Sequence, residues 1–185
     1  MSAAVFLDKD GTLVEDVPYN VDPALVRLTA HASDGLRRLR ACGFRLFVVS
    51  NQSGVALGRF EPAALGGVER RLAELLGEQA RPDGFYWCPH GPADGCDCRK
   101  PRPGMLVRAA REHDLDLARS WMVGDILHDI EAGHRAGCRA VLIDNGNETE
   151  WDLSGSRQPD FRAADLAQAA EHICAEAARA AGGRP

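Results

Sequence analysis

Residues 3–12 read Ala3-Ala4-Val5-Phe6-Leu7-Asp8-Lys9-Asp10-Gly11-Thr12, a short apolar run that ends directly in two carboxylates and a glycine. An uninterrupted apolar run of this length is typical of a strand buried on both faces of a parallel sheet. Gly11 permits the sharp turn that follows such a strand. Open α/β sheets bind ligands beyond the carboxyl ends of their strands. The stretch therefore predicts a buried strand with a polar site at its end.

The rest of the chain alternates short apolar runs with longer amphipathic stretches. The predicted strands cover residues 3–7, 44–49, 84–87, 121–123 and 139–143. The predicted helices cover residues 33–42, 62–79, 103–113, 129–136 and 163–181. This alternation predicts a doubly wound α/β fold, in which a mostly parallel sheet carries helices on both faces and forms three layers.

The length of the chain predicts a single domain over residues 1–185. Residues 13–32 separate the first two polar strand ends, which leaves room for a flap but not for a large cap domain. Residues 145–162 are irregular, and we expect them to form a surface loop. The tail at 182–185 is expected to fray.

The composition restricts the possible partners. Of the 185 residues, 45% are hydrophobic and 26% are charged, and the net charge is −5. Such a chain is globular rather than disordered, and it has no block of lysine and arginine with which to bind nucleic acid or a membrane surface. No apolar run approaches the ~20 residues that span a bilayer, and the N-terminus lacks a signal-peptide pattern. With no apolar stripe left unexplained, we expect a cytoplasmic monomer.

The pair Asp8 and Asp10 points to carboxylate chemistry. Two such groups raise each other's pKa unless a cation lies between them. With Mg²⁺ present, one carboxylate stays ionised while the other holds a proton, which suits a nucleophile beside a general acid. The alternative interpretation is a turn capped by aspartates.

Polar residues also follow the other predicted strands. Ser50-Asn51-Gln52-Ser53-Gly54 offers a hydroxyl, amides and free backbone N–H groups to phosphate oxygens, although turns use the same residues. Arg99 and Lys100 supply two cations for anionic groups, although such a pair is usually solvated surface charge. Asp125 completes a hard-cation site with Asp8 and Asp10. Asp129 lies one helical turn further on, where it could orient a metal-bound water or a lysine. The alternative is that Asp129 only stabilises the start of its helix.

These motifs resemble those of the haloacid dehalogenase-like (HAD) phosphohydrolases over residues 3–150. Three markers are similar to the branch that holds the heptose bisphosphate phosphatases and the histidinol-phosphate phosphatases: 51–54, 88–90 and 96–101. The resemblance implies a Rossmann-like HAD fold and a Mg²⁺-dependent phosphatase with an aspartyl-phosphate intermediate. An inactive zinc-stabilised binding module, the alternative from another class, would require loss of a motif residue, and all are present.

The resemblance also implies the role of each motif residue. Asp8 is the nucleophile, and Asp10 is the general acid and then the base. Ser50 and Lys100 bind the phosphoryl oxygens. Mg²⁺ is held by Asp8, by the backbone carbonyl of Asp10 and by Asp125.

The same resemblance predicts the substrate contacts. Asp16 and Tyr19 lie where the heptose phosphatases contact the substrate beyond its phosphate, and Arg99 is similar to an arginine that recognises a second phosphate. Further expected contacts come from the loop after the second strand: Asn51, Gln52 and Ser53. A small sugar bisphosphate whose 7-phosphate is removed is therefore the expected substrate. Residues 53–54, 85–87 and 103–105 favour it, whereas the short loop 91–95 favours histidinol phosphate or another small phosphomonoester.

Three cysteines and a histidine gather within eleven positions: Cys88, His90, Cys96 and Cys98. Three thiolates and one imidazole form a common tetrahedral zinc set, and because no ligand position stays open we expect a structural zinc-bound loop over 88–98. In a reducing compartment clustered thiols bind metal more often than they pair. The other three cysteines, Cys42, Cys138 and Cys174, are expected to be reduced packing residues.

Overall fold

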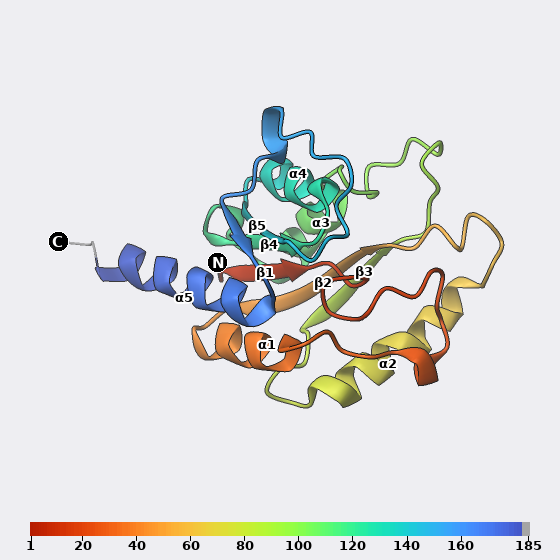
Figure 1. Cartoon of the computed structure of the whole chain (residues 1–185), viewed down its shortest axis with the longest axis horizontal. Helices are drawn as coiled ribbons and strands as arrows, with labels where there is room; N and C mark the ends of the chain where they lie inside the picture. The colour runs from red at the N-terminus through yellow and green to blue at the C-terminus, as the bar shows by residue number, and fades with distance from the viewer. Residues whose placement is uncertain (183–185) are drawn as a thin grey trace.

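Six parallel strands form one sheet in the order β3-β2-β1-β4-β5-β6 (Figure 1). The strands are β1 (Ala4–Leu7), β2 (Arg45–Asn51), β3 (Gly84–Cys88), β4 (Trp121–Gly124), β5 (Arg139–Ile143) and β6 (Phe161–Ala163). The chain builds outward from β1 in one direction and then from β4 in the other, so the topology reverses between these two neighbours. In doubly wound sheets the ligand crevice lies at this switch point.

Five helices cover the two faces of the sheet: α1 (Ala32–Ala41), α2 (Leu65–Leu76), α3 (Gly104–His113), α4 (Leu127–Ala136) and α5 (Leu166–Gly182). In Figure 1, α1, α2 and α5 lie on one side of the strands and α3 and α4 on the other. The predicted three-layer α/β fold is confirmed. The computed structural model describes residues 1–182. Of the tail that was predicted to fray, Gly182 is the last residue of α5, and 183–185 lie outside the described residues.

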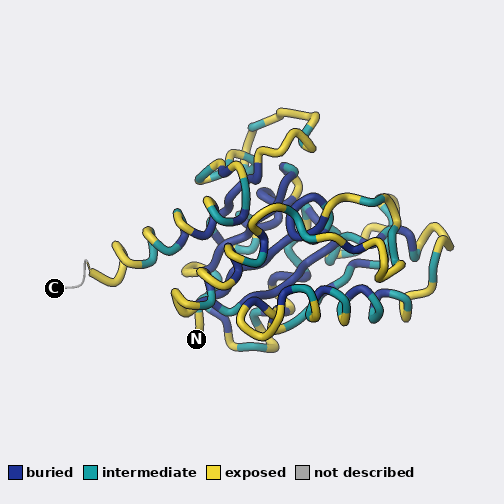
Figure 2. The backbone as a smooth tube through the Cα atoms, turned by 60° about the horizontal axis from the view of Figure 1, so that its bottom comes forward, coloured by how far each residue is buried: buried dark blue, intermediate teal, exposed yellow. Residues whose placement is uncertain are grey.

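Two hydrophobic cores explain why the β1 sequence is apolar throughout. Successive side chains of a strand point to opposite faces. Val5 and Leu7 pack into the core shared with α1, α2 and α5, whereas Ala4 and Phe6 pack into the core shared with α3 and α4. All four are fully buried, and Figure 2 shows the strands as dark-blue segments inside helices whose outer turns are yellow.

The structure adds a sixth strand to the five that the sequence predicts and differs from the prediction at several element bounds. The predicted loop 145–162 contains the start of β6, and the last helix begins at Leu166 rather than at residue 163. The predicted helix 62–79 starts as a 3-10 turn, and α2 ends at Leu76 because Gly77 leaves helical geometry at φ +68°. At the site, β2 extends to Asn51, two residues beyond the predicted strand, so Ser50 and Asn51 end the strand instead of following it. Asp8 and Asp125 follow β1 and β4 as predicted.

The expectation that Cys42 and Cys174 are reduced packing residues is wrong in the structure. The two cysteines form a disulfide with a Cα–Cα distance of 5.9 Å, across a sequence separation of 132 residues. The bond joins the end of α1 to α5, two helices that pack side by side in one core. Cys138 is free and buried, as predicted.

Residues 13–32 form a short excursion over one end of the sheet. It contains a 3-10 turn, Pro23–Leu25, and a bridge that pairs Val14 with Leu28. The single-domain division with a flap at 13–32 stays a prediction. Within residues 1–182, no helix combines the length and the apolar character that crossing a membrane requires.

Candidate active site

The switch point of the sheet brings the acidic motifs together. Asp8 directly follows β1 and Asp125 directly follows β4, and these strands are hydrogen-bonded neighbours. Asp129 reaches the same place from the first turn of α4. Carboxylate oxygens of these three residues all lie within 4.8 Å of one another, and all three side chains are buried.

Lys100 is the cation of this site, and its side chain is 3% exposed. Its ammonium contacts the Asp8 carboxylate, lies 2.6 Å from Asp129 Oδ1 and donates to the Val49 carbonyl at 3.0 Å. Burial acts to lower the pKa of Lys100, but Asp129 and Asp8 outweigh it and raise the pKa above its usual value. Lys100 therefore stays protonated beside the predicted nucleophile.

Asn51 determines where Lys100 lies. The Asn51 side chain accepts a hydrogen bond from the Lys100 backbone N–H at 3.0 Å and donates one to its carbonyl at 3.2 Å. Both polar atoms of this amide are thus engaged with the chain. The geometry gives Asn51 a positioning role, and its predicted contact with substrate stays a prediction.

Asp10 sits at the edge of the site, held by two neighbours. Gln52 Nε2 donates to Asp10 Oδ2 at 3.1 Å and to Ser50 Oγ at 2.9 Å, so it links the predicted general acid to the predicted phosphate-binding hydroxyl. The Lys9 ammonium also contacts the Asp10 carboxylate. Burial raises the pKa of Asp10, while Lys9 opposes the increase. A raised pKa favours the protonated form that a general acid needs.

Asp125 is oriented by two side chains that the sequence did not single out. Thr12 Oγ1 donates to one carboxylate oxygen at 3.2 Å, and Asn147 Nδ2 donates to the other at 2.7 Å. Burial and then Asp8 raise the pKa of Asp125 to about 6. Burial raises the pKa of Asp129 as well, against the influence of Lys100. So many buried acids beside one lysine fit a site built for a divalent cation, which prefers oxygen ligands.

The predicted zinc ligands converge at the end of β3. Cys88 Sγ lies 3.2 Å from Cys98 Sγ and 3.7 Å from Cys96 Sγ, and His90 Nδ1 lies 3.3 Å from Cys98 Sγ. Four ligands about 2.3 Å from a central zinc are separated by about 3.7 Å in a tetrahedron. The four ligand atoms therefore fit a tetrahedral metal.

The predicted substrate-binding residues are divided between two neighbouring cavities, and some of them line neither. A cavity of about 310 Å³ is lined by the acidic residues together with Asp16, Ser50, Asn51 and Lys100. Arg99 lines a second cavity of about 360 Å³, which shares Lys100 with the first. Tyr19 and Ser53 line neither cavity, and the Tyr19 ring is covered by Arg59 at 4.4 Å.

Sequence reasoning missed three contributors to this site: Lys9, Thr12 and Asn147. Lys9 and Thr12 lie inside a motif that was recognised for its aspartates. Their position next to those aspartates is the only feature of the sequence that indicates a role in the site. Asn147 lies in the irregular stretch after β5, where no periodicity or motif marks it. Its role follows only from the fold, which places that stretch beside Asp125.

Comparison with known proteins defines the class of this chain. A family profile described as HAD-hyrolase-like matches residues 97–169. The D-glycero-D-manno-heptose-1,7-bisphosphate 7-phosphatase of Thermosynechococcus vestitus is 39% identical, over 92% of this chain and 95% of that protein. The corresponding β-anomer enzyme of Bordetella bronchiseptica is 35% identical, over 94% of this chain and 98% of that protein.

A solved structure shares the fold. The crystal structure of D,D-heptose 1,7-bisphosphate phosphatase from B. bronchiseptica, complexed with magnesium and phosphate, matches with a TM-score of 0.81 and 34% identity. The match covers 94% of this chain and 99% of that one. The chain therefore belongs to the HAD-like phosphatase family, whose members are phosphoric monoester hydrolases. Within that family, the relatives described above are heptose bisphosphate phosphatases.

Proposed function

We propose that this protein removes the 7-phosphate of D-glycero-D-manno-heptose 1,7-bisphosphate in a Mg²⁺-dependent reaction. The similarity to heptose bisphosphate phosphatases over nearly the whole of both chains carries the proposal. The crystal structure of such a relative with magnesium and phosphate supports the metal and the phosphate site. The acidic cluster of Asp8, Asp125 and Asp129 supplies the charge that a divalent cation needs.

The reaction proceeds in two displacements. An Asp8 carboxylate oxygen attacks phosphorus, the bond from phosphorus to the sugar oxygen breaks, and Asp10 gives that oxygen a proton. Asp10 then takes a proton from water, whose oxygen attacks the phosphorus of the Asp8 phosphate. The bond between phosphorus and the Asp8 oxygen breaks, which releases inorganic phosphate and restores the Asp8 carboxylate. The bonds from Gln52 and Lys9 hold the Asp10 carboxyl beside this path.

Charge neutralisation supplies most of the catalysis in phosphoryl transfer. Lys100 and Ser50 bind the phosphoryl oxygens, and Asp129 keeps Lys100 in place through their 2.6 Å ion pair. Mg²⁺ is held by Asp8, by the backbone carbonyl of Asp10 and by Asp125, and when bound it neutralises charge on the phosphate oxygens.

The second phosphate of the substrate is recognised in the cavity that Arg99 lines. Arg102 lines it too, whereas Arg135 is paired with Glu131, so Arg99 and Arg102 add positive charge to the space beside Lys100. A second phosphate is attracted there, whereas the protonated amine of histidinol phosphate is repelled. Asp16 in the flap lines the active-site cavity and is the residue best placed for a further contact to the sugar. Contacts from Tyr19, Asn51, Gln52 and Ser53 stay predictions.

We assign a structural zinc to Cys88, His90, Cys96 and Cys98. The Arg99 guanidinium donates to the His90 carbonyl at 3.1 Å, so the metal loop fixes the substrate-recognition arginine. We also propose that the protein is a cytoplasmic monomer. A disulfide is unusual in a reducing compartment, so the Cys42–Cys174 bond is the feature that argues most directly against that location.

The test compares phosphate release from heptose 1,7-bisphosphate and from histidinol phosphate with Mg²⁺ present. We expect a higher kcat/KM for the bisphosphate. Arg99→Gln should lower that kcat/KM about tenfold or more, the effect of one charge-assisted hydrogen bond, and should spare histidinol phosphate. Arg111→Gln, a surface change on α3, is the matched control. Faster hydrolysis of histidinol phosphate would overturn the substrate assignment.

A further inference from the structure

The loop after β5 reaches back to the two neighbouring strand ends of the active site. Asn145 Nδ2 donates to the Gly11 carbonyl, in the turn after β1, at 2.8 Å. Asn147 Nδ2 donates to Asp125 Oδ2, directly after β4, at 2.7 Å. Two asparagines from one distant loop therefore contact both loops that are proposed to hold Mg²⁺.

The two asparagines are also bonded to each other. The Asn147 backbone N–H donates to Asn145 Oδ1 at 3.1 Å. Gly146 between them has a φ of +89°, a left-handed conformation that favours glycine. The Asn145 amide is thus engaged on both sides, by Gly11 and by Asn147. We call residues 145–147 the asparagine turn.

Glu148 fixes the far side of the asparagine turn. One of its carboxylate oxygens accepts from the backbone N–H of Leu127, and the other accepts from the backbone N–H of Glu150 at 2.7 Å. Leu127 is the first residue of α4, where a backbone N–H has no partner inside the helix. The turn is therefore attached to the helix that carries Asp129.

These contacts act on two of the three groups that are proposed to hold the metal. Each carboxylate oxygen can accept two hydrogen bonds, and Thr12 and Asn147 each use one position, on different oxygens of Asp125. The remaining positions stay open to a cation. The Gly11 carbonyl lies one residue beyond the Asp10 carbonyl, so its bond to Asn145 restricts the backbone at that ligand. Asparagines orient these ligands without adding a positive charge that would oppose a cation.

We propose that the asparagine turn is a positioning element for the Mg²⁺ ligands, and that Asn147 sets the affinity for the cation through Asp125. This inference rests on the proposed Mg²⁺-dependent function. Losing a hydrogen-bond partner of a metal ligand typically costs about 10–100-fold in metal affinity. Because Asn147 is exposed, we expect a loss at the lower end of this range, about tenfold.

The test measures Mn²⁺ binding by EPR, in which only free Mn²⁺ gives the sharp signal, to zinc-loaded protein dialysed free of Mg²⁺. Asn147→Leu should raise the Kd for Mn²⁺ about tenfold. Asn145→Ala should raise it less, because it acts through the backbone. Since the two side chains form one unit, the double variant should raise the Kd by less than the product of the two single effects.

The same variants should raise the Mg²⁺ concentration that gives half of the maximal phosphatase rate. The KM for heptose 1,7-bisphosphate at saturating Mg²⁺ should stay near the wild-type value, because the turn acts on the metal ligands.

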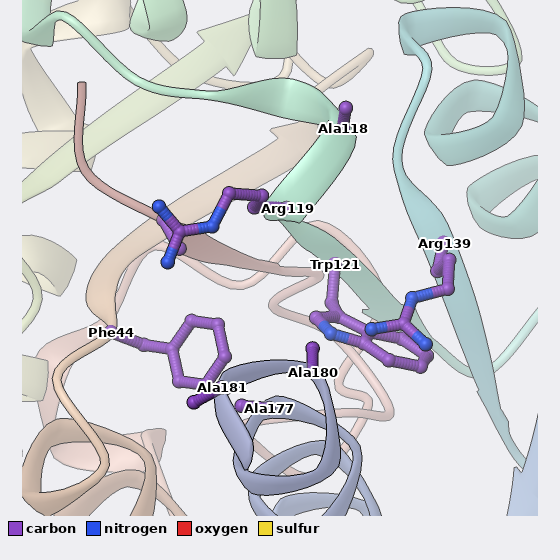
Figure 3. A pocket seen from close by; sticks show the side chains of 9 residues that line it. Phe44, Ala118, Arg119, Trp121, Arg139, Ala177, Ala180 and Ala181 are labelled. Atoms are coloured by element: carbon purple, nitrogen blue, oxygen red, sulfur yellow. The ribbon is translucent and has the colours of Figure 1, made fainter. Parts of the chain in front are cut away.

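Two control variants should keep the wild-type Kd for Mn²⁺. Thr149→Ala changes an exposed side chain of the same loop. Arg119→Gln changes an exposed side chain at the opposite end of the sheet, beside the cavity of about 440 Å³ that lies where β1, β4 and β5 begin (Figure 3).

The metal measurement separates this inference from the proposed substrate, because it needs no substrate. If the wild-type protein binds Mn²⁺ and Asn147→Leu binds it equally tightly, the positioning role is overturned. A lower Tm with an unchanged Kd would leave the turn a structural role only and would overturn it as well. If the wild-type protein binds no Mn²⁺, the proposed metal site is overturned together with this inference.

Discussion

Replacing Gly11 by alanine tests whether the turn after β1 and the Asp125 carboxylate share the same space. Gly11 has a φ of +80°, and an added Cβ would lie 2.1 Å from Asp125 Oδ2 and 2.5 Å from Asn147 Nδ2. Ordinary contact begins at 3.4 Å, so the Asp125 carboxylate must move by more than an ångström. A displacement of about 1 Å in a catalytic group costs roughly 100-fold in rate.

We therefore expect Gly11→Ala to lower kcat for Mg²⁺-dependent phosphate release about 100-fold. The matched control is Gly43→Ala, because Gly43 has a similar φ of +86° and nothing within 4 Å of its added Cβ. Both variants carry backbone strain of about 1 kcal/mol, which lowers Tm by roughly 2–4 °C. Only Gly11→Ala should also lose activity. Equal kcat values for the two variants would refute the shared-space argument.

Three further predictions concern the zinc loop, the disulfide and the Asn51 side chain. Elemental analysis of protein purified without chelator should find roughly one zinc per chain. Cys96→Ser should abolish this zinc, whereas the control Cys138→Ser should retain it. Cys42→Ser should lower the free energy of unfolding in urea by about 2–4 kcal/mol, and the difference should vanish in dithiothreitol. Asn51→Ala removes two hydrogen bonds to the Lys100 backbone and should cost about 2 kcal/mol by the same assay, together with most of the activity. An unchanged unfolding curve for Asn51→Ala would show that this clamp is not needed.

The placement of the main site residues was predictable because it follows from the sheet. Buried apolar runs identify β1 and β4, and parallel strands present their carboxyl ends at the same edge. Asp8 and Asp125 could thus be brought together from the sequence alone. The convergence of Cys88 with the loop to Cys98 was predictable for a similar reason, since its ligands are local.

Contacts between side chains from distant elements could not be predicted in this way. Asp129 suits the first turn of any helix, and only the packing of α4 against the sheet shows that it pairs with Lys100. Asn51 fits a phosphate loop equally well, but in the structure its amide is bonded to the chain. The disulfide partners lie far apart in sequence, and six cysteines allow many pairings. β6 is three residues long and pairs only with β5, too short for periodicity to reveal.

The assignment of Asp8 as the nucleophile is tested most directly by Asp8→Asn, assayed for Mg²⁺-dependent phosphate release from heptose 1,7-bisphosphate. The amide has nearly the same shape but lacks the negative charge and the nucleophilicity of the carboxylate. We predict a loss of kcat of at least about a thousandfold, as when other covalent nucleophiles are removed. A variant that is folded and keeps the wild-type rate would contradict the proposed aspartyl-phosphate mechanism.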